Sequence, residues 1–436
     1  MIFANIQKAI KKKEILFENS GIVGIAFIAI GMYLASSLAA VGTFLVFLSF
    51  VFLIGNRWAH FKKSPFFWAA SIWLLYFYIH GALFMLGDPD LSDGMLRTLR
   101  KLWVAWPIIM IPVILHRKNL SHYFFLAYSV SFILYTFQQL DWSIASLIGT
   151  SRPHLRHLNP QHYGLLSGIS FFAFMYLLYY LWPRLQKRVR LVTSLMLFMG
   201  ASMSLQILLL SQSRGPWLAF LGAFLFSLVV IYGLLLKRER LKVTALATLV
   251  LLVSVGTLTY HLGGGVYDRL TQETSVIIVI INDGIENAPP TSWGKRAHLL
   301  AAGIRAIQEK PLFGWGWGAA NFIIQHDDFI HEEAQHYNHF HNQWVDVGVR
   351  LGILGVVLFM AVFAALFYGI YRNIKYEKTE WPFAVFACAV IIMISIAFSF
   401  ESYLSFFTWW QNFSLFAGLI AAWFSKDKIF STAAKG

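Results

Sequence analysis

Long apolar stretches separated by short polar segments dominate this chain. Twelve of them approach the roughly 20 residues that a helix needs to cross a membrane. The strands of a membrane barrel would instead alternate polar and apolar residues. We therefore predict an all-α polytopic membrane protein with about twelve transmembrane helices. The stretches cover residues 21–37, 38–55, 65–87, 102–116, 121–138, 162–182, 191–211, 216–236, 243–261, 345–371, 382–400 and 405–424.

The spacing of these stretches divides the chain into five parts, one of which is a large polar loop. Within that loop, a helix is predicted from Ser292 to about Glu309, because Pro311 follows and cannot continue it. The five predicted parts are an amphipathic N-terminus at residues 1–20, nine transmembrane helices at 21–261, the large loop at 262–344, three transmembrane helices at 345–424 and a tail at 425–436.

Lysine and arginine indicate the orientation of the chain. If residues 1–20 are cytoplasmic and the spans alternate, the segments on the cytoplasmic side hold 23 of the 35 basic residues, Arg57 among them. Cytoplasmic loops of membrane proteins carry such an excess. We therefore expect both termini in the cytoplasm and the large loop on the opposite face.

Composition agrees with a membrane protein and narrows its chemistry. Hydrophobic residues make up 58% of the chain and charged residues 13%, against about 25% charged in soluble domains. The net charge of +14 is explained by lysines and arginines on short loops, which set the orientation of the spans. No nucleic-acid partner is therefore expected. Cys388 is the only cysteine, which excludes an intrachain disulfide and a cysteine metal site.

A histidine-rich segment lies where the large loop meets the tenth apolar stretch. Histidine is the side chain best suited to move protons near neutral pH. His331-Glu332 is followed by His336 at i+5, whereas the zinc-protease helix requires i+4. We predict no metal, and one general base, His341 or His339, among structural histidines.

Arginines are predicted on the same face as these histidines. Arg214 lies in a tight turn between two spans, and Arg296 lies in the helix of the large loop. Arg152 and Arg156, in an external segment that ends near Asn159, can bind phosphate or grip lipid headgroups. An interfacial arginine can also simply extend its charge to water.

Arginine binds phosphate in a two-pronged arrangement and stays charged, so it can stabilise a leaving diphosphate. Arginines and a base on one external face therefore suggest a diphosphate-bearing substrate. ATP and nucleotide sugars are confined to the cytoplasm, so the donor is expected to be lipid-linked.

These motifs resemble those of the O-antigen ligase family. The family signature of His, Asn/Ser/Gln, nine residues, Gly, two residues and a small residue matches four positions. The segment S-R-G-P-W-L-A resembles the family's arginine turn, and R-x-x-x-L through P-L-F-G-x-G resembles its second arginine motif. Asn159-Pro160 resembles a motif before the sixth span. The four signature positions are His341, Asn342, Gly352 and Gly355.

The resemblance implies a glycosyltransferase C-type fold and a metal-independent, inverting transfer without a cofactor. The implied donor is undecaprenyl-diphosphate-linked O-antigen, and the acceptor is a sugar hydroxyl of the lipid A–core. The implied location is the periplasmic face of the Gram-negative inner membrane, among membrane lipids. By analogy His341 is the base, and Arg214 and Arg296 bind the diphosphate. Candidate supporting residues are His339, Asn342, Arg152, Arg156 and Asn159.

Other functions fit parts of the same pattern. An O-antigen polymerase or a protein O-oligosaccharyltransferase uses the same class of donor. Polymerases often have two large external loops, and this chain has one. A lipid or sugar transporter would carry functional charges near the membrane midplane and show an internal repeat, whereas the charges here lie at one face.

Overall fold

In the part of the chain that the computed structural model describes, the regular elements are helices. One isolated β-bridge joins Leu155 and Leu158. These observations agree with the predicted all-α polytopic protein. The structure describes residues 2–87, 102–116, 119–139, 155, 158–235, 256, 274–377 and 381–425.

Eleven of the twelve predicted apolar stretches coincide with described helices. The remaining stretch, 243–261, lies outside the described residues except for one helical position. By length and composition, seven of the described helices can cross a membrane, and two shorter ones are also apolar. The count of twelve spans therefore stays a prediction.

The chain forms two compact units, and the first consists of Met1–Tyr135, Leu354–Trp381 and Leu404–Gly436. Helix α1 runs without a break from the predicted amphipathic segment into the first predicted span. Its complete helices are α1 (Ile2–Leu34), α2 (Ser36–Phe61), α3 (Pro65–Gly87), η1 (Leu102–Ala105), α5 (Pro107–Leu115) and α17 (Phe407–Phe424), with most of α6 (Ser121–Gln139) and the second part of α15 (Gln343–Glu377).

The structure corrects the loop position expected for Arg57. Arg57 lies inside α2 and is 2% exposed. It forms a 3.0 Å ion pair with Glu18 and donates to the carbonyl of Ile114 at the end of α5. A buried charge must be paired and hydrogen-bonded, so Arg57 holds α1, α2 and α5 together rather than marking a loop.

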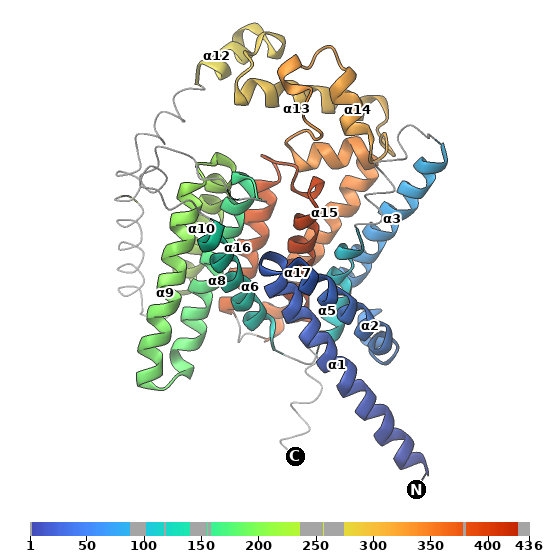
Figure 1. Ribbon diagram of the computed structural model, residues 1–436, viewed down its shortest axis with the longest axis vertical. Coiled ribbons are helices and arrows are strands. Elements are labelled where there is room, and N and C mark those ends of the chain that lie inside the picture. Colours follow the sequence, from blue (N-terminus) through green and yellow to red (C-terminus); the bar gives the residue numbers. More distant parts are fainter. Residues whose placement is uncertain are drawn as a thin grey trace. The chain divides into compact units, whose positions relative to one another are not determined.

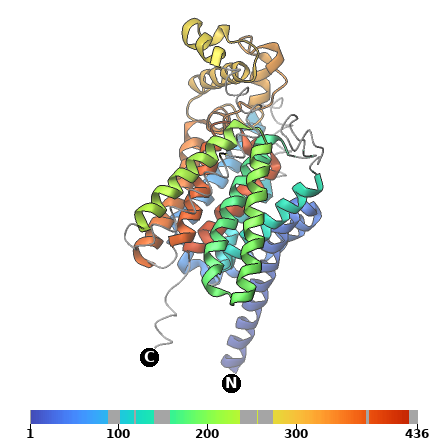
Figure 2. The ribbon, with the colours of Figure 1, turned by 90° about the vertical axis from the view of Figure 1, so that its left-hand side faces the viewer.

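The second unit, Thr136–Ile353 with Pro382–Tyr403, carries all the signature residues from Asn159 to Gly352. Its long helices α8, α9, α10 and α16 lie side by side (Figure 1), and Figure 2 shows α8 and α9 running together along their length. The helices of this unit are α8 (Pro160–Leu181), α9 (Lys187–Leu210), α10 (Arg214–Leu235), α12 (Thr274–Asp283), α13 (Ser292–Glu309), α14 (Ala319–His326), the first part of α15 and nearly all of α16 (Trp381–Ala397).

The loop before α15 has its own apolar core, which α13 helps to form. The predicted helix from Ser292 to Glu309 is confirmed at both ends, and the Thr291 hydroxyl accepts from the Gly294 backbone N–H as its N-cap. The core is formed by Leu299, Ala302, Ala306, Ala320, Ile324, Ile330, Ala334, Phe340 and Val349.

Where the loop meets α15, backbone hydrogen bonds join residues 311–316 to residues 349–353, and this pairing is called the clasp below. Gly352 interrupts the helix with φ 68° and ψ −177°. The kink leaves the carbonyls of Val349 and Arg350 to accept from the N–H groups of Trp315 and Gly316, at 2.7 and 3.0 Å. The Ile353 N–H in turn donates to the Pro311 carbonyl at 2.8 Å. The clasp thus joins the P-L-F-G-x-G motif to the glycine of the histidine signature.

Replacing Gly352 by alanine should destabilise the protein, because a Cβ there would overlap the Leu312 carbonyl. Positive φ also disfavours any residue with a Cβ. Overpacking of this kind costs about 1–3 kcal/mol, so the thermal unfolding midpoint in detergent should fall. Gly55→Ala on α2 is the matched control, since nothing lies within 4 Å of its Cβ position. Equal midpoints for the two variants would contradict this account of the clasp.

Candidate functional site

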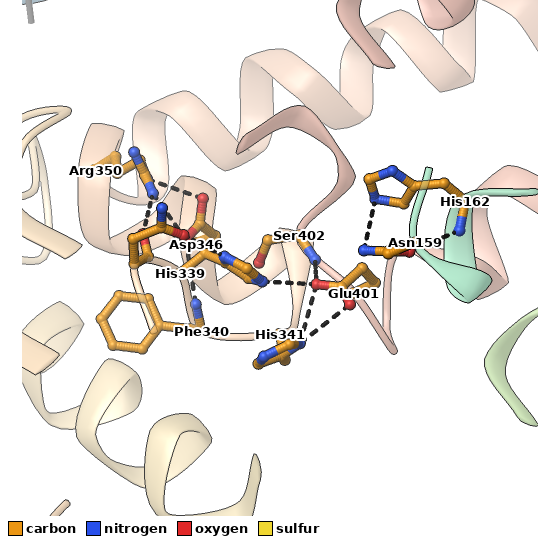
Figure 3. A network of polar contacts seen from close by, with 10 residues as sticks. Asn159, His162, His339, Phe340, His341, Asp346, Arg350, Glu401 and Ser402 are labelled. Atoms are coloured by element: carbon orange, nitrogen blue, oxygen red, sulfur yellow. Dashed lines mark hydrogen bonds and ion pairs between the residues drawn. The ribbon is translucent and has the colours of Figure 1, made fainter. Parts of the chain in front are cut away.

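The carboxylate of Glu401 is the centre of a buried polar cluster between α16 and η5 (Tyr403–Ser405). Its Oε1 lies 2.8 Å from His339 Nε2 and 3.0 Å from His341 Nδ1, and Oε2 lies 3.1 Å from the same His341 nitrogen. The Ser402 backbone N–H donates to Oε1 at 3.0 Å. Figure 3 shows both imidazoles directed at the one carboxyl group. A single acid therefore orients both histidines of the signature.

The two histidines differ in the contacts that their ring nitrogens make. His339 Nδ1 lies 2.7 Å from Asn338 Oδ1, and its Nε2 is at ion-pair distance from Glu401. His341 Nε2 has no hydrogen-bond partner among the described residues. Because the carboxylate accepts from the Nδ1–H of His341, the lone pair of that ring is on Nε2. Of these two histidines, only His341 has a ring nitrogen with neither a hydrogen bond nor an ion pair among the described residues.

Burial and the shared carboxylate set the proton affinities of the pair. Burial lowers the pKa of His341, and the hydrogen bond and charge of Glu401 oppose that effect. The nearby His339 and Arg296 lower this pKa further. Burial alone would raise the pKa of Glu401, but the hydrogen bonds and charges of the two histidines hold it well below its usual range. The carboxylate is thus ionised beside an imidazole that stays neutral near pH 7.

The backbone holds His341 in an uncommon conformation. Its φ is 51°, the left-handed region that residues other than glycine rarely occupy. The neighbour on each side is fixed. Phe340 is 1% exposed in the loop core, and Asn342 Oδ1 accepts from the N–H of Trp344 and Val345 at the start of α15. Strain of this kind persists where surrounding contacts determine the backbone.

A buried ion pair one turn into α15 supports the same segment. Asp346 Oδ2 lies 2.8 Å from Arg350 Nε, and both side chains are buried. Asp346 Oδ1 accepts from the Phe340 N–H at 3.4 Å, between the two histidines. Arg350 donates to the carbonyls of Trp317 and Asn338 at 2.8 and 3.2 Å. The pair therefore ties the histidine segment to both α15 and the loop.

Helix α13 brings Arg296 to the histidines. Gly303, two turns later on the helix, packs against Phe340 and Val345 with no room for a Cβ. Arg296 is half-buried, and its charge acts on His341 and on Tyr403. Within the described residues it makes no hydrogen bond or ion pair. Its guanidinium is thus a positive charge that acts on His341 and has no carboxylate partner among the described residues.

Arg214 begins α10 in the turn predicted for it. The turn passes through Gln212, whose φ is 46°. Gly215 packs against Phe400 and the side chain of Gln161, so the arginine is one residue from a contact with the segment that carries Glu401. The arginine turn, the second arginine and the first three positions of the histidine signature thus belong to one unit, while Gly355 belongs to the other.

The Asn159-Pro160 motif caps α8 beside this cluster. Asn159 Oδ1 accepts from the His162 N–H at 3.0 Å, and Pro160 takes the first helical position. The His162 ring lies 5.2 Å from that of Tyr403, and the Tyr403 hydroxyl donates to the Gln161 carbonyl at 3.3 Å. Asn159 is thus the N-cap residue that begins α8.

Other predicted residues are not part of the cluster. Arg152 and Arg156 lie outside the described residues. His331 accepts from the Glu333 N–H with Nδ1, and His336 is exposed and contacts the Tyr337 ring. These two histidines have the structural character expected of most of the segment.

A comparison with family models gives one match, described as O-antigen ligase, over residues 199–360. This part of the chain is similar to the O-antigen ligase family. The matched range contains Arg214, Arg296, His339, His341 and Gly352 and covers less than half of the chain's 436 residues. A comparison with curated proteins found no match.

Glu401 lies outside the part matched to the O-antigen ligase family, and the sequence did not single it out. It is 60 residues from His341 and follows the apolar stretch 382–400. One signal was present, because a lone acid between two apolar stretches must be paired if it is buried. Its partners could not be named from local sequence, since they come from another part of the chain.

Among the described residues, His339, His341 and Glu401 are the one group whose ligand atoms lie close enough together to hold a metal ion. Zinc bonds to nitrogen and oxygen are about 2.0–2.2 Å long, which puts two ligands of a tetrahedral site roughly 3.4 Å apart. The 2.8 and 3.0 Å contacts from Glu401 are shorter and are typical of direct hydrogen bonds. The geometry therefore fits a proton-sharing cluster better than a metal centre.

Replacing Asp346 by asparagine should destabilise the protein strongly. Asparagine has nearly the same shape as aspartate, but it leaves the buried charge of Arg350 uncompensated. Breaking a buried ion pair costs about 3–5 kcal/mol. The control is Lys295→Ala, which removes an ion pair with the exposed carboxylate of Glu333 and should cost at most about 1 kcal/mol. The thermal unfolding midpoints of the purified variants measure the difference. A similarly small decrease in both variants would argue against a stabilising role of the Asp346–Arg350 pair.

Proposed function

We propose that the protein is an O-antigen ligase. It transfers O-antigen polysaccharide from undecaprenyl diphosphate to a sugar hydroxyl of the lipid A–core, at the periplasmic face of the Gram-negative inner membrane. The observation that carries the proposal is the Glu401–His341 pair, whose Nε2 has no hydrogen-bond partner among the described residues, near the Arg296 guanidinium. The family match over residues 199–360 supports the same assignment.

In the proposed reaction His341 acts as the general base. Its Nε2 takes the proton from the acceptor hydroxyl while Glu401 stabilises the imidazolium that forms. The acceptor oxygen bonds to the anomeric carbon of the donor sugar from the face opposite the diphosphate. The bond from that carbon to the diphosphate oxygen breaks, and its electron pair leaves with the undecaprenyl diphosphate. This single displacement inverts the anomeric carbon.

Arg296 and Arg214 are proposed to bind the diphosphate. Negative charge grows on the bridging oxygen as the sugar leaves, and a guanidinium fixed nearby stabilises it without rearranging. Arg296 is suited to this because the described residues leave its hydrogen-bonding groups unused. No metal is required in this scheme, since the two arginines supply the positive charge that a divalent ion would otherwise provide.

His341→Ala should abolish the transfer, and His339→Ala should weaken it less. A general base contributes about 10²–10⁴-fold to the rate, whereas His339 only helps to hold the shared carboxylate. The readout is the lipopolysaccharide banding of a deletion strain that expresses each variant. Immunoblots of membrane fractions check that each variant inserts.

For an O-antigen ligase, the strain expressing His341→Ala should show core without O-antigen and should accumulate lipid-linked polymer. Core bearing a single repeat unit would instead identify a polymerase. An active His341→Ala beside an inactive His339→Ala would transfer the role of base to His339.

The acid limb of the pH–rate profile should report His341. Its pKa is lowered from 6.5, so the wild-type rate should fall only below about pH 6.5. Glu401→Gln removes the carboxylate charge that raises this pKa, so the acid limb should move to lower pH while the plateau rate drops. The measurement is kcat/KM against pH for purified protein with lipid-linked donor and lipid A–core. An unmoved acid limb would show that Glu401 does not act through the base.

A further inference from the structure

The turn that follows α13 presents adjacent large apolar side chains at the surface. Leu312 is 64% and Phe313 is 56% exposed, although the turn backbone is firmly held. The Gly314 N–H donates to the Lys310 carbonyl at 3.1 Å. Contiguous exposed apolar side chains can mark a site of contact with a membrane or another protein.

The clasp at Gly352 fixes where this turn lies along α15. Pro311 accepts from the Ile353 N–H, and the backbone of Leu312 and Phe313 packs directly against Gly352. The turn is therefore level with Gly352 and Ile353. Ile353 is itself 48% exposed, so apolar side chains of the turn and of the helix are exposed at the same level.

The sequence of α15 shows what that level is. After the kink at Gly352, the helix holds 19 residues without a charge from Ile353 to Tyr371, before Arg372. At 1.5 Å per residue this run is about 29 Å long, which is close to the roughly 30 Å hydrocarbon core of a bilayer. Ile353 is at the beginning of this run and hence at one edge of the hydrocarbon.

We infer that the Leu312–Phe313 turn inserts into the edge of the lipid bilayer, with acyl chains of the adjacent monolayer as its partner. The neighbouring residues fit that depth. Lys310 is exposed, and its Nζ lies 3.7 Å from the centre of the Trp315 ring. A lysine and a tryptophan side by side are typical of the headgroup region, where each has one apolar and one polar part.

This contact anchors the loop independently of the reaction proposed above. The turn follows the end of α13, the helix that carries Arg296. A turn held in lipid on one side and by backbone hydrogen bonds to α15 on the other fixes the depth of α13 relative to the membrane. An arginine that binds the headgroup of a lipid substrate has to be held at such a fixed depth.

Spin labels on the full-length protein test the depth of the turn directly. In a Cys388→Ala background, Leu312→Cys carries the label, and Phe313→Cys is a second reporter should the first variant fold poorly. Val357→Cys in α15 and Gln325→Cys on the exposed side of α14 are the lipid and water references. Each protein is reconstituted in vesicles of phosphatidylethanolamine and phosphatidylglycerol, and label relaxation is measured with molecular oxygen and with a water-soluble nickel chelate.

Insertion predicts that a label at 312 or 313 is reached by oxygen and is several-fold less accessible to nickel than the label at 325. Accessibility to nickel equal to that at 325 would place the turn in water and overturn the inference. Protection from both reagents would also overturn it, because the turn would then be covered by protein, either another part of this chain or a second copy. Neither readout requires a catalytically active protein, so this result is separate from the test of the ligase.

Discussion

A carboxylate that is almost excluded from water has to be surrounded by donors, and Glu401 satisfies this requirement with two histidines and a backbone N–H. The donors come from the end of the large loop, and the acid comes from the segment after α16. The cluster therefore exists only when two stretches far apart in sequence are packed together. The left-handed His341, the cap at Asn342 and the Asp346–Arg350 pair all maintain that packing.

Features determined by local sequence were predictable. The bounds of α13 follow from its periodicity, from Thr291 before it and from Pro311 after it. The position of Arg214 at the start of a helix follows from the short polar break between two apolar stretches. Such signals act within one or two turns of helix, where the preferences of neighbouring residues decide the structure.

Features determined by tertiary contact were not predictable from the sequence alone. Helical spacing alone would place Leu299, Leu300 and Ile304 on one apolar face, but the last two are 37% and 45% exposed. The buried face is chosen by Phe340 and Val345, which pack on Gly303. Likewise Arg57 has the appearance of a loop charge until its partners on α1 and α5 are known.

The electrostatic coupling between Arg296 and His341 has a consequence for the order of events under the proposed function. A cation near the imidazole weakens it as a base. A bound diphosphate would cancel that cation and add negative charge of its own, which strengthens the base. The base would then be strongest once the donor is bound, so deprotonation of the acceptor hydroxyl would follow donor binding.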